Sequence, residues 1–250
     1  MRRCTDELLD YTEELAREEI LRLPDGTYEF TDHIDADNIK EGPVDIKVKL
    51  VIHGDRITVD LEGSSPQVKA GINSPMPFTR SLVWGSVRLV MSPDIPNSMG
   101  YTRLIEVLAP EASVVNGRLP APCGARGITG LRIMDAVMGA LAQAVPERVP
   151  ADGEGGNSII SIGGYDSALE PFAFVELISG ARGGRPFGDG PEGVPHPAAN
   201  ISNIPVEIAE AELPIRIEEY SILQDSGGAG EFRGALSQAR RVRCLADDAT

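Results

Sequence analysis

The segment VDIKVKLVIHGDRITVDLE, residues 44–62, decides the fold class of the chain. Apolar and polar side chains alternate along both of its halves, and Gly54-Asp55 separates the two halves. Alternation with a period of two is typical of a strand that has one buried and one solvated face. The segment therefore predicts a β-hairpin in an antiparallel sheet.

A short polar segment, residues 63–67 (GSSPQ), follows the hairpin. Loops at strand ends are common places for ligand-binding side chains. A plain exit turn is the favoured interpretation, because Gly, Ser and Pro are the usual residues of turns.

Three segments have the apolar spacing of helices. Residues 5–23 predict an amphipathic helix that Thr5 caps, with acidic side chains near its positive end. Residues 79–91 and 129–145 predict further helices with apolar inner faces, and residues 102–108 predict a strand. Together with the hairpin, these elements indicate an α+β fold of mixed, largely antiparallel sheets with a few packed helices.

The C-terminal part of the chain differs in composition from the rest. Glycine-rich joints separate short apolar segments, and residues 158–162 and 172–178 predict strands. We therefore expect a helix–hairpin–helix part over residues 1–150 and a glycine-rich β part over residues 151–250. A single continuous domain over 1–250 is the alternative.

The composition excludes several classes of protein. Acidic residues outnumber basic ones 38 to 23, which argues against nucleic-acid binding because Lys and Arg dominate the binding of phosphates. No apolar run can span a bilayer and the N-terminus lacks the apolar core of a signal peptide, so we expect a cytoplasmic protein with no membrane contact. Three distant cysteines, Cys4, Cys123 and Cys244, indicate reduced thiols.

Candidate functional residues concentrate in the C-terminal third. Asp225 lies at the end of an alternating strand and precedes Gly227, Gly228 and Gly230. These glycines permit positive φ angles or the close approach of another group. Arg233 follows them, and it either binds a carboxylate bidentately or pairs with Asp225.

Histidine is scarce, and only one of the three is near this candidate site. His33 is expected in an acidic loop and His53 at the hairpin turn, both exposed. His196 lies four residues before Asn200 and is a candidate catalytic residue, although a structural role is favoured. No pair of histidines has metal-ligand spacing, so no metal ligands are assigned.

Two further groups of charged residues have open interpretations. Arg182 lies in the glycine-rich stretch 179–185, which could bind an anion but lacks the spacing of a P-loop. Glu207, Glu210 and Glu212 indicate a solvated acidic face.

Several motifs in this order resemble the hydantoinase B/5-oxoprolinase family, to which subunits of acetone and acetophenone carboxylases are related. The motifs are residues 23–28 (LPDGTY), 63–67 (GSSPQ), 72–75 (INSP), 93–97 (PDIPN), 146–151 (PERVPA), 203–207 (NIPVE) and 225–234 (DSGGAGEFRG).

The resemblance implies the ring-opening hydrolysis of a cyclic amide such as 5-oxoproline or a hydantoin. It also implies a hetero-oligomer with an A-type subunit, which uses ATP to phosphorylate the carbonyl oxygen of the substrate. In the context of this resemblance, we assign catalysis to Asp225, Arg233 and His196. Substrate binding is assigned to Arg182, Asn200, Asn203, Glu207 and Gly228.

The chain also departs from the family pattern. Family members continue upstream through a segment rich in His, Asp and Gly that resembles a metal site, so a divalent metal is expected only through that upstream half. Ala235 and Ser237 replace glycines that typically follow Arg233. We expect a fragment truncated at both ends, and a non-catalytic scaffold or a ketone carboxylase subunit are the alternative functions.

Overall fold

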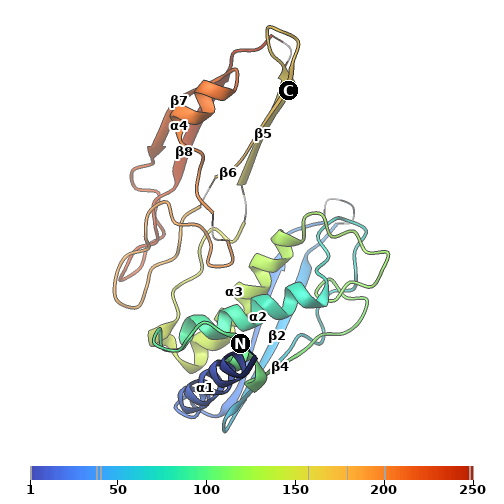
Figure 1. Ribbon diagram of the computed structural model, residues 1–250, viewed down its shortest axis with the longest axis vertical. Helices are drawn as coiled ribbons and strands as arrows, with labels where there is room; N and C mark the ends of the chain where they lie inside the picture. The colour runs from blue at the N-terminus through green and yellow to red at the C-terminus, as the bar shows by residue number, and fades with distance from the viewer. Residues whose placement is uncertain are drawn as a thin grey trace. The chain divides into compact units, whose positions relative to one another are not determined.

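The computed structural model describes residues 2–37, 39, 41–156, 158–178, 180–199, 201–247 and 249. It divides into two compact units, unit 1 (Met1–Val149) and unit 2 (Pro150–Thr250), shown in Figure 1. No helix in the described part of the chain combines the length and the apolar character needed to cross a membrane.

Unit 1 is built on a four-stranded sheet in the order β1-β2-β3-β4. The strands are β1 (Gly26–Ile34), β2 (Val44–His53), β3 (Arg56–Asp60) and β4 (Ile105–Leu108). The β1–β2 and β2–β3 pairs are antiparallel, whereas β3 and β4 run parallel. The predicted hairpin and the predicted α+β class are both confirmed.

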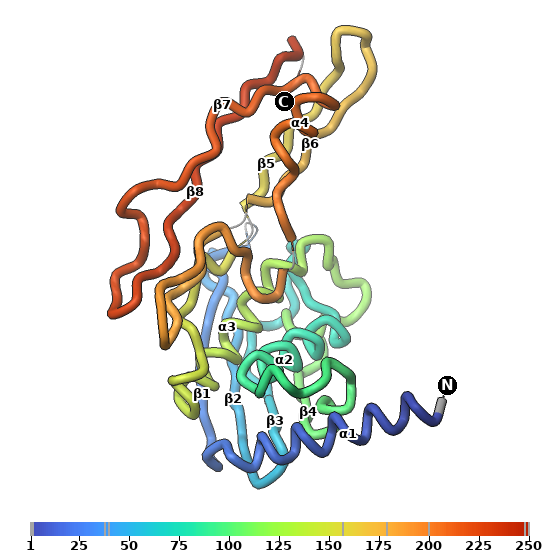
Figure 2. Tube along the Cα trace, turned by 60° about the vertical axis from the view of Figure 1, so that its left-hand side comes forward, coloured from blue at the N-terminus to red at the C-terminus, as the bar shows by residue number. Residues whose placement is uncertain are grey.

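One face of this sheet is buried beneath helices. Helix α3 (Arg126–Ala144) packs against β1 and β2, and α2 (Met76–Val90) packs against α3. Figure 2 shows both helices on the same side of the sheet. The apolar residues that alternate along β2 and β3 are at most 5% exposed: Val44, Ile46, Val48, Leu50, Ile52, Ile57 and Val59.

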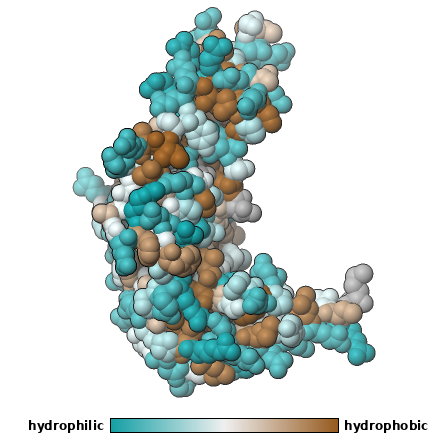
Figure 3. All heavy atoms as spheres, turned by 90° about the vertical axis from the view of Figure 1, so that its left-hand side faces the viewer, coloured by the Kyte–Doolittle hydropathy of each residue, from teal (hydrophilic) through white to brown (hydrophobic). Residues whose placement is uncertain are grey.

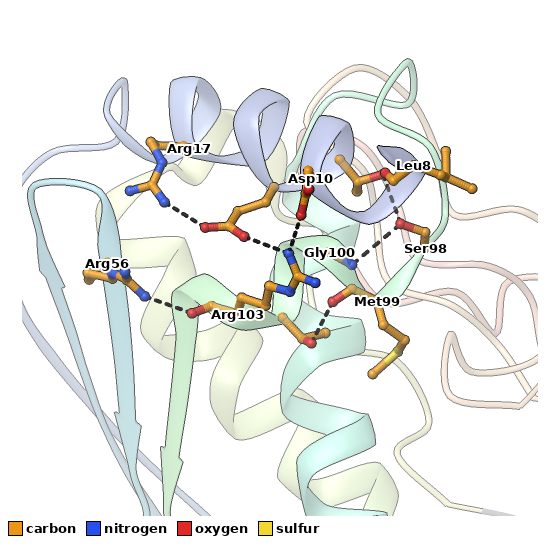
Figure 4. A network of polar contacts seen from close by, with 11 residues as sticks. Leu8, Asp10, Arg17, Arg56, Ser98, Met99, Gly100 and Arg103 are labelled. Carbon is orange, nitrogen blue, oxygen red and sulfur yellow. Dashed lines mark hydrogen bonds and ion pairs between the residues drawn. The ribbon is translucent and has the colours of Figure 1, made fainter. Parts of the chain in front are cut away.

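Helix α1 (Arg2–Ile20) packs along the short 3-10 helix η1 (Met99–Leu104) through the polar network of Figure 4. Arg103 Nη1 donates to Asp10 Oδ1 at 2.8 Å and to Glu13 Oε2 at 3.1 Å. These bonds raise the pKa of Arg103, and the bond from Arg103 is the main reason that the pKa of Glu13 lies below its usual value.

The start of α1 differs from the prediction over residues 5–23. The helix begins at Arg2, so Thr5 lies inside it and does not cap it. Arg3 Nε and Glu7 Oε1 are 2.9 Å apart, at the i,i+4 spacing that favours helix. This pair supports a helical turn upstream of the expected cap.

The first strand was not predicted. Residues 26–34 form β1, and His33 lies in it opposite Asp45 of β2, so the expectation of an acidic loop around His33 was wrong. The polar segment after the hairpin is bonded to β2, where Lys47 N donates to Ser64 Oγ at 3.0 Å.

Unit 2 contains two separate antiparallel ribbons and one short helix. The first ribbon pairs β5 (Ser158–Tyr165) with β6 (Pro171–Ile178), and the second pairs β7 (Ile215–Ile222) with β8 (Gln238–Cys244). Helix α4 (Val206–Glu212) precedes β7 and was not predicted. The acidic residues of α4 are exposed, in agreement with the solvated acidic face.

A small core and a buried ion pair join the two ribbons. The core consists of Phe174, Ala209 and Ile215, with partly buried neighbours. Beside it, Glu176 of β6 pairs with Arg240 of β8, and the two side chains are 3% and 1% exposed. Burial of this kind is tolerated only when charges are paired, so the pair fixes β6 against β8.

Candidate functional site

Two glycine-rich loops of unit 2, residues 180–190 and 227–235, are bonded to each other through their main chains. We call them the glycine-loop cluster. Ala235 N donates to Arg182 O at 2.8 Å and Gly190 N to Arg233 O at 2.8 Å, which joins the loops, while Gly234 N donates to Gly228 O at 2.9 Å within the second loop. Of the candidate site residues, the structure thus brings together Arg182, Gly228 and Arg233.

Of the two expected reasons for glycine in this turn, the structure shows close approach and not positive φ. None of Gly227, Gly228 and Gly230 has a positive φ; Asp225 has one instead, at 57°. Asp is among the few non-glycine residues that visit this region readily. Gly227 is needed for close approach, because an added Cβ would lie 2.6 Å from Gly234 O.

Asp225 is exposed at the tip of this turn. The turn is fixed by its neighbour: Ser226 Oγ donates to Leu223 O at 2.7 Å and accepts from Ser237 N at 2.7 Å. The Asp225 carboxylate is therefore presented to solvent on an ordered turn.

Arg233 pairs with acids other than Asp225. Its Nη1 lies 2.8 Å from Glu192 Oε1 and its Nε lies 3.5 Å from Asp189 Oδ2. Its main-chain N also donates to Asp189 Oδ1 at 3.0 Å. The alternative in which Arg233 pairs with Asp225 is therefore wrong, and Arg233 joins the two loops of the cluster.

Arg182 has a different environment. It is half-buried, its Nε is shielded from solvent, and this Nε has no hydrogen-bond partner among the described residues. Burial lowers the pKa of Arg182, and the nearby charge of Arg185 lowers it further.

His196 lies near Glu154 and caps a turn of its own. Its Nδ1 accepts from Ala198 N at 3.1 Å, so in the neutral ring the proton is on Nε2. Partial desolvation raises the pKa of Glu154, while bonds from Ser158 and the charge of His196 act in the opposite direction.

Asn203 lies between the two ribbons and uses both ends of its amide there. Its Nδ2 donates to Leu177 O at 2.6 Å, and its Oδ1 accepts from Tyr220 at 2.8 Å. The Tyr220 ring in turn faces the guanidinium of Arg240 at 3.8 Å. Asn203 is therefore connected, through Tyr220, to the buried Glu176–Arg240 pair.

The remaining candidates are separate from the cluster in the contacts that the structure records. Glu207 is exposed in the first turn of α4, where a carboxylate suits the helix dipole. Asn200 lies outside the described residues.

Sequence reasoning missed the acids that organise this part of the chain. Asp189 and Glu192 are more than 40 residues from Arg233, so no local pattern pairs them. Glu176 is the acidic residue at an inward-facing position of β6, and that break in apolar alternation was an available signal.

Comparisons with known proteins agree with this architecture. Residues 1–250 match the family model described as Hydantoinase B/oxoprolinase. The B-type subunit of a putative D-/L-hydantoinase from Pseudomonas sp. (strain NS671) is 32% identical over 255 residues, which cover 98% of this chain and 43% of the relative. The chain thus spans less than half the length of that relative.

Two solved structures share the fold. The crystal structure of an ATP-dependent caprolactamase from Pseudomonas jessenii matches with a TM-score of 0.86 and 29% identity, over 97% of this chain and 43% of the other. A nucleotide-free acetone carboxylase matches with a TM-score of 0.82 and 18% identity, over 96% of this chain and 34% of the other, which shows the fold alone. The chain belongs to the hydantoinase B/oxoprolinase family.

Proposed function

We propose that this chain is part of the B-type component of an ATP-dependent enzyme that opens cyclic amides, working with an A-type partner that uses ATP. The observation that carries this proposal is the match to the caprolactamase structure over 97% of this chain at 29% identity. The relative named as a hydantoinase component supports the same class of substrate.

The chemistry explains why two components are needed. The carbonyl carbon of a cyclic amide is a poor electrophile, and transfer of a phosphoryl group from ATP to its oxygen makes attack by water feasible. Ring opening then consumes two waters in all and gives ADP, phosphate and the opened product, which is an amino acid from a lactam and an N-carbamoyl amino acid from a hydantoin. The B-type component must bind an anionic intermediate and guide a proton to the leaving nitrogen.

Within this proposal the residues of unit 2 have distinct roles. Asp225 is the candidate general base, because its carboxylate is exposed on an ordered turn. Arg182 and the main-chain groups near Gly228 bind the anion. Arg233 and His196 position the loops, through Glu192 and Ala198 respectively.

The remaining binding candidates take supporting roles in the proposal. Asn203 orients the segment before α4, and Glu207 presents its carboxylate from the first turn of that helix.

The test is a reconstitution with an A-type partner. The purified chain, the partner and ATP are incubated with 5-oxoproline, hydantoin or caprolactam, and the release of ADP and of the ring-opened product (an amino acid, or an N-carbamoyl amino acid from hydantoin) is measured. We expect ring opening only when both proteins and ATP are present. Asp225→Asn should lower turnover by about 10²–10⁴-fold, the usual contribution of a general base.

A scaffold function is the second candidate, and exposed apolar residues favour it. Leu8 and Tyr11 of α1 are 46% and 53% exposed, and Figure 3 shows apolar residues between polar ones on this helix, at the lower right. On the outer face of β5–β6, Ile159, Tyr165 and Val175 are 60%, 56% and 59% exposed. No turnover in any combination, with stable binding of the A-type partner, would support the scaffold and contradict the enzyme.

A further inference from the structure

We propose that Arg182 and Arg185 form a binding site for an anionic oxygen group, either a carboxylate on the substrate or the phosphoryl group of its activated form. The inference rests on the proposed function for the identity of the ligand. If the ligand is the substrate carboxylate, the site favours anionic over neutral cyclic amides; if it is the phosphoryl group, the site binds the activated form of either. The inference is based on the observation that neither guanidinium group has a recorded carboxylate partner, although the protein is rich in acidic residues.

Arg182 carries a polar group that the protein itself does not satisfy. Its Nε is shielded from solvent and has no acceptor among the described residues. A buried N–H without an acceptor costs about 1–3 kcal/mol, and more when the group is charged. The two terminal nitrogens are not among the shielded atoms and make no recorded hydrogen bond, so an anion can bind both of them in the bidentate geometry that Arg favours.

Arg185 adds a second positive charge that no recorded acid neutralises. Its Nε donates to the main-chain oxygen of Asp189 at 3.0 Å, and its guanidinium lies 5.2 Å from the centre of the Phe187 ring. Both partners are uncharged, so among the described residues neither Arg182 nor Arg185 has a carboxylate. Two like charges without a counter-ion repel each other, and a bound anion removes that repulsion.

Arg233, in the same loops, has acidic partners and therefore has a structural role. It binds Asp189 and Glu192 across the two loops. The chain has 38 acidic residues, so acids were available to neutralise Arg182 as well. Within the glycine-loop cluster, Arg182 thus differs from Arg233, which has two recorded acidic partners.

The main chain around Arg182 is fixed in advance. Ala235 N donates to Arg182 O at 2.8 Å, and Ala151 N donates to Gly184 O at 2.8 Å. A Cβ added to Gly183 would lie 2.0 Å from Ala151 O, and one added to Gly184 would lie 2.3 Å from Phe232 O. A rigid support reduces the entropy lost when an anion binds.

The experiment measures binding by the purified 250-residue chain and needs no turnover. Calorimetry compares L-5-oxoproline, 2-pyrrolidone (the same ring without the carboxylate) and inorganic phosphate. Arg182→Gln removes the charge and keeps the length of the side chain. Arg216→Gln, at an exposed position of β7, is the matched control.

We expect the wild type and Arg216→Gln to bind 5-oxoproline, phosphate or both, and to bind 2-pyrrolidone at least about tenfold more weakly. Arg182→Gln should lose at least about tenfold in affinity for the anion, as expected for a charge-assisted hydrogen bond. Arg182→Lys keeps the charge but lacks the planar guanidinium that binds an anion bidentately, so it should lose part of the affinity for the anion. Which anion binds identifies the source: carboxylate or phosphoryl group.

Stability without ligand provides a second readout. Arg182→Gln removes a desolvated and repelled charge, so its melting temperature should equal or exceed that of the wild type. No anion binding by the wild type, equal binding of 2-pyrrolidone, or unchanged binding by Arg182→Gln would overturn the proposal. Anion binding without turnover in the reconstitution would overturn the proposed function and leave this site intact.

Discussion

Unit 1 and unit 2 are stabilised by different kinds of contact. In unit 1, one continuous core includes the inner face of the sheet and both long helices that cover it. In unit 2, the small apolar core consists of Phe174, Ala209 and Ile215 with partly buried neighbours, and a buried ion pair and main-chain bonds between glycine loops supply further contacts. Unit 2 should therefore be the more sensitive to changes of charge and of backbone shape.

The largest effect should come from breaking the buried pair. Glu176→Gln leaves the Arg240 charge without its partner, and loss of one member of a buried pair costs about 3–5 kcal/mol. Hydrogen exchange of β6 and β8 in mild denaturant, read by mass spectrometry, reports unit 2 separately from unit 1. We expect faster exchange in unit 2 and no change in β2.

The matched control is an exposed pair in the same unit. Arg241 and Glu219 are 69% and 33% exposed, so Glu219→Gln should cost less than about 1 kcal/mol. Replacement of both Glu176 and Arg240 by leucine should recover much of the loss. Equal effects of Glu176→Gln and Glu219→Gln would show that unit 2 does not depend on its buried charge.

An intermediate effect should follow from adding a methyl group between main chains. In Gly184→Ala the new Cβ would lie 2.3 Å from Phe232 O, a backbone atom that cannot move alone. Overpacking of this kind costs about 1–3 kcal/mol. Denaturant unfolding of unit 2, followed by the same exchange method, measures the cost.

Unit 1 offers a contrasting glycine. In Gly139→Ala the new Cβ would lie 2.7 Å from the ring of Phe30, which is 40% exposed and can rotate away. In the interior of a helix such as α3, alanine is also more favourable than glycine by about 1 kcal/mol. The variant should change the free energy of unfolding very little. A loss of stability as large as that of Gly184→Ala would show that the two units respond alike to an added methyl group.

The smallest effect concerns the surface network of unit 1. The folded-state pKa of Glu13 lies below its ordinary value, chiefly because of Arg103, so its stabilisation is complete above the ordinary pKa of about 4.3. The stabilisation is lost as the pH falls through the lower, folded-state pKa. Because solvent screens a pair at the surface, the change in stability should be small.

Thermal melting from pH 6 down to pH 3 tests this dependence. The wild type should be slightly more stable than Glu13→Gln at pH 6, and the difference should shrink toward pH 3. Glu14→Gln, on the exposed side of α1, should show no such trend. If the stability difference between the wild type and Glu13→Gln grew as the pH fell, Glu13 would not be stabilised by its charge.

Local patterns predicted the parts of the fold that depend on neighbours in sequence. The hairpin over β2 and β3 and the helix α3 follow from apolar periodicity. Strand β1 escaped prediction because none of its nine residues is buried: four are partly buried and five are exposed, so its alternation is weak. Helix α4 escaped because its seven residues, flanked by prolines, are too few to establish a helical period.

The candidate site was predicted less well than the fold, for a physical reason. The glycine turn and Arg182 were visible as residue types, but their partners come from distant segments. Arg233 meets Asp189 and Glu192, and Asn203 meets Tyr220 and β6, only after the loops and ribbons have formed. Long-range pairing of this kind leaves no spacing in the sequence.

The parallel pairing of β3 with β4 has a consequence for synthesis of the chain. Strands β1, β2 and β3 are close in sequence and can pair as soon as they leave the ribosome, because short loops close at low entropic cost. Strand β4 emerges only after α2 and η1, so β3 waits with an open edge that can pair with another chain. Until β4 pairs with β3, this open edge is the part of the sheet most exposed to incorrect pairing.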